Sequence, residues 1–377
     1  MKLFCHQPFS RISIDNSGDI WPACCPDWVE FPLGNIFTQN WDEIWYGEAA
    51  KKFRDSMYDG SLRHCNHNWC SYIADAVAGM ESGVVVPHDK RPPEWVSRPP
   101  IHLNMNYDER CNLRCPSCRQ DFIHYEGKSL KGVEYVHEYV ETNILPMIES
   151  IALTGVGDPF YSPLFRDFLM NFDPQKYPNL KKIHFHTNGQ LFDEKIYDKM
   201  KGIHHLKLSI DISIDAANSE VYSKLRPPGN WNRLIKNLQF IKGLDNLECL
   251  GISMVVQQEN YKQMMAFVEL GESLIHKDRF TFVEFKRITK KYDSMNQKDS
   301  ALDEVAPLIK KDFLKRLHLI EKKRLSNAKK RTMPEIRHNL QEYLMSPEVS
   351  LSPLDRISSM ISSISPSFGM MKWMDSE

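Results

Sequence analysis

The sequence predicts an α/β fold in two parts, a small cysteine-rich N-terminal unit followed by a parallel sheet covered by helices. Eight of the nine cysteines lie in the first third of the 377 residues. From residue 101 onward, strand-like segments alternate with helix-like segments, which is typical of a parallel sheet with crossover helices. Six such units fit a partial (β/α)6 barrel as well as an open sheet, and periodicity alone does not choose between them.

Length, charge and composition indicate an ordinary globular protein. A chain of 377 residues suggests two domains, or one large domain with an appendage. The 48 Lys and Arg balance 49 Asp and Glu, so the net charge of −1 excludes a protein that binds nucleic acid through bulk positive charge. No apolar run approaches the roughly 20 residues that span a bilayer, and the N-terminus lacks a signal-peptide pattern. We therefore expect a cytoplasmic protein without a membrane segment.

The first unit is predicted to cover residues 1–83. Residues 11–14 alternate polar and apolar side chains, and the turn sequence Asn-Ser-Gly-Asp separates them from an apolar pair at 20–21, which predicts a short hairpin. Apolar residues at helical spacing predict a helix over 41–58. The following segment contains five prolines, which indicate a stiff, extended linker, so the domain boundary is placed at 84–100.

The barrel unit is predicted to cover residues 101–287. Its expected strands are 101–106, 150–154, 182–187, 206–215, 251–257 and 280–285. Its expected helices are 133–144, 163–171, 193–200, 231–242 and 261–275. In barrels of this type the chemistry takes place at the carboxyl ends of the strands.

Residues 288–377 are predicted to form a basic helical extension and a Ser-, Met- and Pro-rich tail. From Lys286 to Arg337 there are 16 Lys and Arg against 7 Asp and Glu. One interpretation is a solvated helical face, and the other is contact with an anionic substrate, phosphate or RNA. Because the segment has no pattern of interleaved aromatic residues, a nucleic-acid partner is not expected.

The strongest chemical signal is a cysteine triad directly after the first barrel strand. Cys111, Cys115 and Cys118 follow a C-x3-C-x2-C spacing on one predicted loop. Thiolates so spaced can converge on one face of an iron–sulfur cube, which normally takes four of them. Three ligands leave one iron open to an exogenous chelator. The alternatives are a zinc site without its fourth ligand, or three unrelated loop cysteines.

The fourth predicted strand has a polar face. Ser209, Asp211, Ser213 and Asp215 alternate with isoleucines, so all four polar side chains share one side of the strand. Burying such a face is costly unless a ligand satisfies it. The pattern therefore indicates a ligand-binding barrel interior.

Together these motifs resemble the radical S-adenosylmethionine (SAM) superfamily, from about residue 101 to 285. The resemblance implies a partial (β/α)6 barrel and a 4Fe–4S cluster with SAM at the open iron. Gly155, Gly157 and Asp158 resemble the family's Gly-Gly-Glu-type segment, whose backbone edge holds the methionine amino group; Asp158 stands where the family more often has Glu. Thr187 and Asn188 match a Thr-Asn-Gly motif that ends the third strand in the family. The competing interpretation is a plain strand-to-helix turn.

The resemblance also assigns the rest of SAM. It places Ser213 and Asp215 near the ribose and Arg226 near the carboxylate. One departure is Ser117, which stands where many members have an aromatic residue, so adenine stacking must come from elsewhere. The implied reaction is one-electron reductive cleavage of SAM to a 5′-deoxyadenosyl radical, which abstracts a substrate hydrogen. It requires a one-electron reductant such as flavodoxin or ferredoxin.

The N-terminal unit is similar to the SPASM or twitch auxiliary-cluster domain, placed here before the barrel instead of after it. The resemblance assigns Cys5, Cys24, Cys65 and Cys70 as ligands of an auxiliary 4Fe–4S cluster, with Cys25 as an alternative to Cys24. A structural zinc site is the competing interpretation, because four cysteines also suit tetrahedral zinc. An auxiliary cluster with four thiolates is expected to transfer electrons.

The resemblance favours a radical SAM enzyme that modifies peptides of the ribosomally made class, by crosslinking, epimerisation or oxidation. The first alternative is a dehydrogenase or epimerase of a sugar or other polar metabolite. The second is an iron–sulfur electron-transfer protein without radical chemistry, or an RNA-modifying enzyme. Cys249 is a candidate hydrogen donor to a substrate radical, although a lone cysteine beside a strand is more often a small buried hydrophobe.

Overall fold

The computed structural model describes most of the chain up to the end of the predicted barrel. The described residues are 2–22, 26–67, 70–77, 83–91, 98–119, 121–276, 279–286, 312, 315–316, 318–320 and 335–338. Cys24, Cys25 and most of the predicted basic extension and tail lie outside them. Among the described helices, none is both long enough and apolar enough to cross a membrane.

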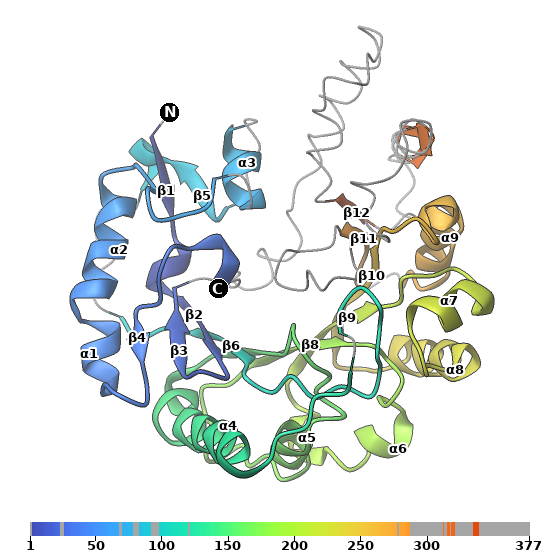
Figure 1. Cartoon of the computed structure of the whole chain (residues 1–377), viewed down its shortest axis with the longest axis horizontal. Helices are drawn as coiled ribbons and strands as arrows, with labels where there is room; N and C mark the ends of the chain where they lie inside the picture. The colour runs from blue at the N-terminus through green and yellow to red at the C-terminus, as the bar shows by residue number, and fades with distance from the viewer. Residues whose placement is uncertain are drawn as a thin grey trace, which may run out of the picture.

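One ten-stranded sheet runs through the molecule in the order β12-β11-β10-β9-β8-β7-β6-β2-β3-β4. Its six central strands are mutually parallel: β6 His102–Asn106, β7 Ser150–Leu153, β8 Lys182–Thr187, β9 Lys207–Ser213, β10 Leu247–Val255 and β11 Phe280–Lys286. Helices cover the outer face of this curved sheet (Figure 1): α4 Gly127–Tyr139, α5 Pro163–Met170, α6 Glu194–Tyr197, α7 Ser219–Leu225, α8 Trp231–Lys242 and α9 Met264–Ser273. The predicted partial barrel is confirmed.

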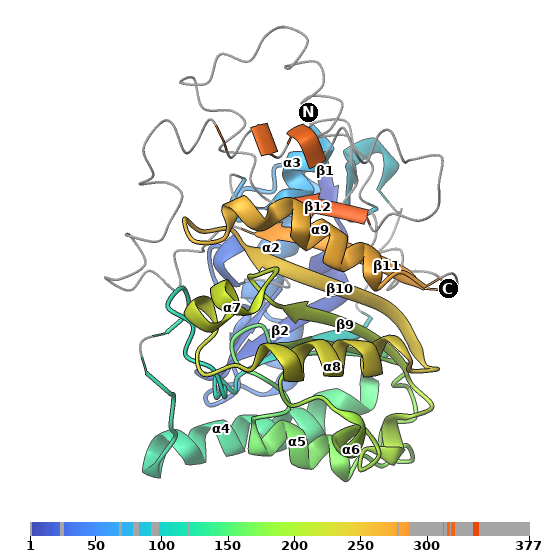
Figure 2. The ribbon, with the colours of Figure 1, turned by 90° about the vertical axis from the view of Figure 1, so that its right-hand side faces the viewer.

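The two faces of the barrel wall differ in polarity, as the alternation in the fourth strand predicts. Ile210 and Ile212 of β9 are completely buried. A Cβ atom added to Gly189 would contact both Ile212 and Leu234 of α8, which places the isoleucine face toward the outer helices. Figure 2 shows α7, α8 and α9 outside strands β9, β10 and β11. The polar side chains of β9 consequently face the barrel interior.

Side-chain caps fix the starts of outer helices α5, α6, α7 and α8. Ser162 Oγ accepts from the backbone N–H of Phe165 at the start of α5, where Pro163 occupies the first turn. Asn230 caps α8 in the same way. Because the caps fix where each helix begins, they also fix the loops that leave the carboxyl ends of the strands.

The N-terminal unit joins the barrel sheet directly. Strand β2 (Arg11–Asp15) lies parallel to β6, in register from the pair Arg11 and His102 to the pair Asp15 and Asn106. The predicted hairpin is confirmed, since β2 pairs with β3 (Asp19–Trp21), and β3 pairs in turn with β4 (Gly34–Asn35). Strands β2, β3 and β4 of the cysteine-rich unit therefore extend the barrel sheet beyond β6.

The predicted linker over 84–100 begins inside the N-terminal unit. Strand β5 (Val85–Pro87) pairs antiparallel with β1 (Leu3–Cys5) in a separate two-stranded sheet. Helix α3 (Ser71–Val77) packs against β5. The β-branched valines fit a paired strand better than a free linker. Residues 92–97 of the same segment lie outside the described chain.

The single helix predicted over 41–58 is in fact two helices. Helix α1 (Trp41–Trp45) ends before Gly47, and α2 (Glu48–Tyr58) begins after it. A Cβ atom on residue 47 would lie 1.9 Å from the carbonyl oxygen of Glu43, so the tight break requires glycine. The continuous apolar spacing hid this break from the sequence analysis.

Several barrel elements differ from their predicted bounds. The helix predicted from 133 begins at Gly127 and closes with a π-helical turn over Val140–Ile144. Strand β10 begins at Leu247, four residues early, with an irregular register against β9 after that residue. Helix α7 was not predicted, and β12 (Glu335–His338) adds a further parallel strand beside β11.

Candidate iron–sulfur and cofactor site

The cysteine loop leaves the carboxyl end of β6 and is anchored at its start. Tyr107 is completely buried and its hydroxyl lies 2.7 Å from Nδ1 of His137 on α4. The fully buried Asp108 carboxylate forms an ion pair with Arg110 and accepts the Ser162 hydroxyl at the start of α5. A buried charge-assisted network of this kind holds the loop in one conformation.

The three candidate cluster ligands lie on this anchored loop. The backbone N–H of Cys118 donates to the carbonyl of Cys115, a turn that brings the two residues together. Burial raises the pKa of the Cys111 thiol to about 12 and that of Cys115 to about 11, and a neighbouring cysteine adds to each shift. Among the described residues, the seven cysteines form no disulfide.

The donor set fits a multi-iron cluster. In the described part of the chain, no three His, Cys, Asp or Glu side chains converge as ligands of one metal ion do. Thiolates around a cube of several irons are spread more widely than ligands around a single ion. The three candidate thiols share one anchored loop, and neighbouring thiols raise each other's pKa, so the donor type and their proximity are compatible with an iron–sulfur cube.

The segment after β7 docks against the cysteine loop through its backbone. Gly157 lies so close that an added Cβ atom would be 2.4 Å from the Asp108 carbonyl oxygen. The next N–H, of Asp158, donates to the carbonyl of Arg110 at 3.0 Å. Thr154 Oγ1 accepts the N–H groups of Val156 and Gly157, which shapes the turn. This contact holds the backbone edge of the turn beside the cysteine loop.

We expect Gly157→Ala to lower the free energy of unfolding by about 1–3 kcal/mol, because the added methyl group meets backbone that has no room to move. Gly155→Ala is the matched control, since a Cβ atom there meets nothing closer than 4.0 Å. Urea unfolding of both variants measures the difference. Equal losses at the two positions would contradict the docking contact.

Asp158 lies inside the protein and connects the ends of β7 and β8. Its side chain is completely buried and accepts hydrogen bonds from the Thr187 hydroxyl at 2.8 Å and from the Asn188 N–H at 2.9 Å. Burial raises the pKa of this carboxyl, against those hydrogen bonds. The side chain of Asn188 reaches the cysteine loop, with Nδ2 2.8 Å from Asn112 Oδ1 and 3.6 Å from Cys111 Sγ. The predicted Asp158, Thr187 and Asn188 thus form one connected unit.

Asp215 and Arg226 form a buried ion pair. Nη2 of Arg226 lies 2.6 Å from Asp215 Oδ2, and Asp215 Oδ1 accepts the N–H of Val255. Asp215 has a positive φ of 61°, a conformation that few non-glycine residues adopt. Burial lowers the pKa of the Arg226 guanidinium, but Asp215, Cys115 and Tyr222 together raise it above its ordinary value. The Arg226 charge also acts on the buried Cys115 thiol.

The barrel interior holds a charged cluster that the sequence analysis did not find as a unit. Asp211 of β9 is completely buried, with Lys286 Nζ at 3.0 Å and His186 Nδ1 at 3.4 Å from its Oδ2. Burial alone raises the pKa of Asp211, but Lys286 and His186 hold it well below its ordinary value. Glu284 lies 3.1 Å from the same lysine. The alternating histidines of β8 were the available sequence signal.

The interior hydrogen bonds continue along β8. Nε2 of His184 lies 3.0 Å from Nε2 of His186, and its Nδ1 lies 2.9 Å from Ser209 Oγ. Burial lowers the pKa of His184 well below its ordinary value, and the neighbouring His186 adds to this. One direction of donation is consistent throughout, from Ser209 to His184, from His184 to His186 and from His186 to Asp211. Ser213 is placed by a 3.3 Å contact with Ser253 of β10.

Buried neutral histidines give the fold an acid-sensitive stability. Burial, with Arg11 and Lys182 nearby, lowers the pKa of His102 to about 3. The unfolded chain takes up a proton at this residue near pH 6.5 and the folded protein does not, so stability falls as pH drops from about 6.5 toward 3, by about 1.4 kcal/mol per pH unit. Urea unfolding at several pH values should show that the free energy of unfolding of His102→Gln depends less steeply on pH than that of the wild type. The exposed His124→Gln is the control, and an unchanged slope for His102→Gln would contradict the assignment.

Three predicted auxiliary-cluster cysteines lie in the N-terminal unit. Cys5 is on β1 beside Val85 of β5, and Cys70 directly precedes α3, which packs against β5. Burial raises the pKa of Cys65 to about 12, and the nearby Cys70 adds to the shift. Cys65 pairs through its backbone with Val29. Cys24 and Cys25, which precede this stretch in sequence, lie outside the described residues.

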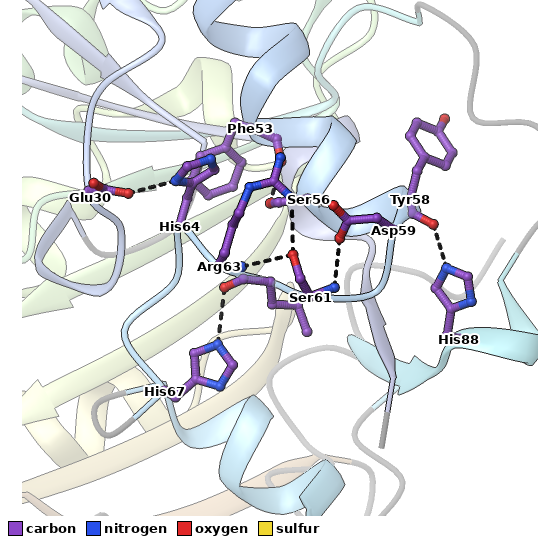
Figure 3. A network of polar contacts seen from close by, with 11 residues as sticks. Glu30, Phe53, Ser56, Tyr58, Asp59, Ser61, Arg63, His64, His67 and His88 are labelled. Atoms are coloured by element: carbon purple, nitrogen blue, oxygen red, sulfur yellow. Dashed lines mark hydrogen bonds and ion pairs between the residues drawn. The ribbon is translucent and has the colours of Figure 1, made fainter.

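Polar contacts brace the loop that carries Cys65 (Figure 3). Nδ1 of His64 lies 2.6 Å from Glu30 Oε2. The His64 ring also packs edge-on against Phe31. His67 Nε2 lies 3.1 Å from the carbonyl oxygen of Leu62. Both histidines that flank Cys65 are therefore engaged with protein partners.

Cys249 lies on β10, two residues before Gly251 and four before Ser253, so it shares their interior face. It is only 5% exposed and lies in register with Ser209 of β9 and Phe280 of β11. Ser253 at the end of the strand contacts Ser213, which places Cys249 deeper in the barrel than the candidate SAM residues.

Comparisons with known proteins agree with this geometry. A family model described as the radical SAM superfamily matches residues 105–271, and a SPASM iron–sulfur cluster-binding domain model matches residues 5–71. Residues 105–271 are therefore a radical SAM domain. The SPASM domain precedes the radical SAM domain, as predicted. The cofactors that the two models imply are a 4Fe–4S cluster with SAM and an auxiliary iron–sulfur cluster.

Curated relatives of this radical SAM protein are distant. A GTP 3′,8-cyclase of Clostridium perfringens is 24% identical over 45% of this chain and 51% of its own length. Another, of Aquifex aeolicus, is 25% identical over 58% of this chain and 67% of its own. A tungsten-containing aldehyde ferredoxin oxidoreductase cofactor-modifying protein of Pyrococcus furiosus is 21% identical over 43% and 46%. The chain spans about half the length of the first of these relatives.

Solved structures also match parts of this chain. Streptococcus suis SuiB bound to its precursor peptide SuiA is 13% identical, with a TM-score of 0.44, over 82% of this chain and 67% of its own. The AdoMet-bound enzyme anSMEcpe is 20% identical, with a TM-score of 0.46, over 63% and 64%.

Proposed function

We propose that this enzyme cleaves SAM reductively at a cluster held by Cys111, Cys115 and Cys118. The observation that carries the proposal is the contact of the cysteine loop with two neighbouring strand ends, through Asp158 N–H and through Asn188. When bound, the cluster and SAM supply a 5′-deoxyadenosyl radical, which abstracts a hydrogen atom from the substrate. The chain contributes binding, orientation and exclusion of water.

In this proposal the chain's own polar groups surround SAM. The backbone of Gly155 and Gly157 holds the methionine amino group, and Ser213 with Asp215 lies near the ribose. Arg226 binds the SAM carboxylate while it keeps its ion pair with Asp215. Its Nε has no hydrogen-bond partner among the described residues, which supports a donor reserved for a ligand. Asp158 and Thr187 position the strand ends from inside.

The substrate is proposed to be polar, because the interior wall beyond the SAM residues carries fixed charges. Asp211 Oδ1 has no hydrogen-bond partner among the described residues, although the side chain is completely buried. His186 and Lys286 keep about a quarter to a third of their side chains exposed. An apolar substrate would leave this wall unsatisfied, at a cost that a hydroxyl or amino group removes.

Two substrate classes fit a polar wall. Peptide modification of the ribosomally made class, by crosslinking, epimerisation or oxidation, is supported by the SPASM domain. A sugar or other polar metabolite is supported by the compact charged cluster around Asp211. In an epimerisation, Cys249 is proposed to return the hydrogen atom. A flavodoxin or ferredoxin is the proposed reductant.

The auxiliary cluster is proposed to be held by Cys5, Cys65, Cys70 and either Cys24 or Cys25. We expect Cys65→Ala to lose about four irons per chain while SAM cleavage in the absence of substrate persists, because the barrel cysteines remain. Iron analysis and 5′-deoxyadenosine formation measure the two effects. Cys249→Ala should keep its full iron content and is the matched cysteine control. Loss of SAM cleavage together with the iron would contradict two independent clusters.

The function is tested with anaerobically reconstituted protein, dithionite and SAM. Formation of 5′-deoxyadenosine by the wild type is the expected result. Peptides and sugars are then added in separate reactions. The true substrate class is the one that accelerates SAM cleavage and whose own mass changes during the reaction. A loaded, reducible cluster that binds SAM but yields no 5′-deoxyadenosine with any substrate would favour the electron-transfer alternative.

A further inference from the structure

Arg119, which directly follows Cys118, touches both the candidate cluster and the candidate SAM edge. Its Nε and Nη2 atoms each lie 3.4 Å from Cys118 Sγ. Nη2 also donates to the carbonyl of Val156 at 2.5 Å, and Nη1 donates to the carbonyl of Glu109 at 2.5 Å. One planar group therefore joins a proposed cluster thiolate to the turn after β7.

The chemistry of this contact bears on cluster reduction. A guanidinium stays protonated and presents its N–H groups in a fixed fork. Hydrogen bonds to cluster sulfurs and nearby positive charge raise the reduction potential, because they stabilise the more negative reduced cluster. Arg119 supplies both to Cys118.

The contact between Arg119 and the Val156 carbonyl bears on SAM binding. Val156 lies between Gly155 and Gly157, the backbone edge that the proposed function assigns to the methionine amino group. Because the arginine fork is rigid, the orientation of this edge and the orientation of the N–H groups toward Cys118 Sγ are set together. A ligand that binds the edge thereby acts on the sulfur contact.

We propose that Arg119 is a positioning residue that couples SAM binding to reduction of the cluster, an inference that rests on the proposed function. The coupling is reciprocal: if SAM shifts the reduction equilibrium by some factor, reduction shifts SAM affinity by the same factor. No electron or atom passes through Arg119. It sets how strongly SAM binding influences the reduction of the cluster.

The test is potentiometric EPR of the SAM-sensitive cluster in full-length, reconstituted protein, with and without SAM. We expect Arg119→Met to make reduction about tenfold less favourable, ~59 mV for one electron, and to lose most of the shift caused by SAM. Arg119→Lys keeps the charge without the fork, so it should recover part of the potential and little of the coupling. SAM affinity measured in both oxidation states closes the thermodynamic cycle.

Arg114→Met is the matched control. Arg114 is exposed on the same loop and its side chain stacks near Phe122. Its removal takes away a nearby charge and should leave the SAM-linked shift intact. An Arg119→Met protein with a wild-type potential and shift would overturn the inference, as would equal effects of the two variants. If Arg119→Met fails to hold iron, Arg119→Lys decides. If SAM changes neither the EPR signal nor the reduction potential of the wild-type cluster, the proposed function is overturned instead.

Discussion

Cys115→Ala should abolish 5′-deoxyadenosine formation, with a loss of more than about 100-fold. Loss of a group that merely supports a metal ligand costs 10–100-fold, and here a proposed ligand itself is removed. Cys115 is the most buried of the three barrel cysteines, at 6% exposed. Neither water nor another described cysteine on this loop can replace it without movement of the loop. The measurement is product formation with SAM and dithionite, together with iron content.

Ser117→Ala is the control for this substitution. Ser117 is also buried in the loop, and it offers no thiolate. The Ser117→Ala variant should keep its iron and its activity, while Cys115→Ala should lose about four irons per chain. Retained activity in Cys115→Ala would contradict the proposed ligand set. A zinc content that replaces iron in the wild type would support the competing zinc interpretation instead.

The barrel could be predicted because local patterns determine most of it. Strand β8 and helix α8 have the predicted bounds, since period-two spacing is clear in Lys182–Thr187 and helical spacing in Trp231–Lys242. The cysteine triad and the polar face of β9 were likewise visible. Both depend on residues close together in sequence.

Long-range pairing accounts for what the sequence did not reveal. The pairing of β2 with β6 joins Arg11 to His102 across most of the N-terminal unit, and no local pattern names a strand's partner. Lys286 was counted with the basic extension, and only its register beside Val255 on β10 places it near Asp211. Arg119 belongs to none of the sequence motifs, and only its contacts with Cys118 Sγ and the Val156 carbonyl distinguish it from other loop arginines.

The candidate site also shows where motif matching reaches its limit. The motif containing Asp158 indicated a SAM-binding segment, but only the structure reveals that the Asp158 side chain turns inward to Thr187. Likewise, Asp215 and Arg226 were assigned separately to ribose and carboxylate, yet they form one ion pair. Spacing in sequence identifies the segment, and packing decides which of its atoms face a ligand.

Arg226→Met should destabilise the fold by about 3–5 kcal/mol, because it leaves the Asp215 carboxylate buried without its counter-charge. Asp215 is 1% exposed, so water cannot replace the guanidinium. Its remaining backbone partner, the N–H of Val255, carries no full charge. The same change should weaken SAM binding, since it removes the proposed carboxylate donor. Urea unfolding and SAM titration measure the two effects.

The double variant Asp215→Asn with Arg226→Met separates stability from binding. Replacing both members of a buried ion pair restores much of the stability that removal of one member loses, so the double variant should unfold closer to the wild type. SAM binding should stay weak, because the donor is still absent. Full recovery of SAM affinity in the double variant would contradict a role for Arg226 in binding the carboxylate. Recovery of neither property would indicate that Arg226 stabilises the site through the packing of its stem.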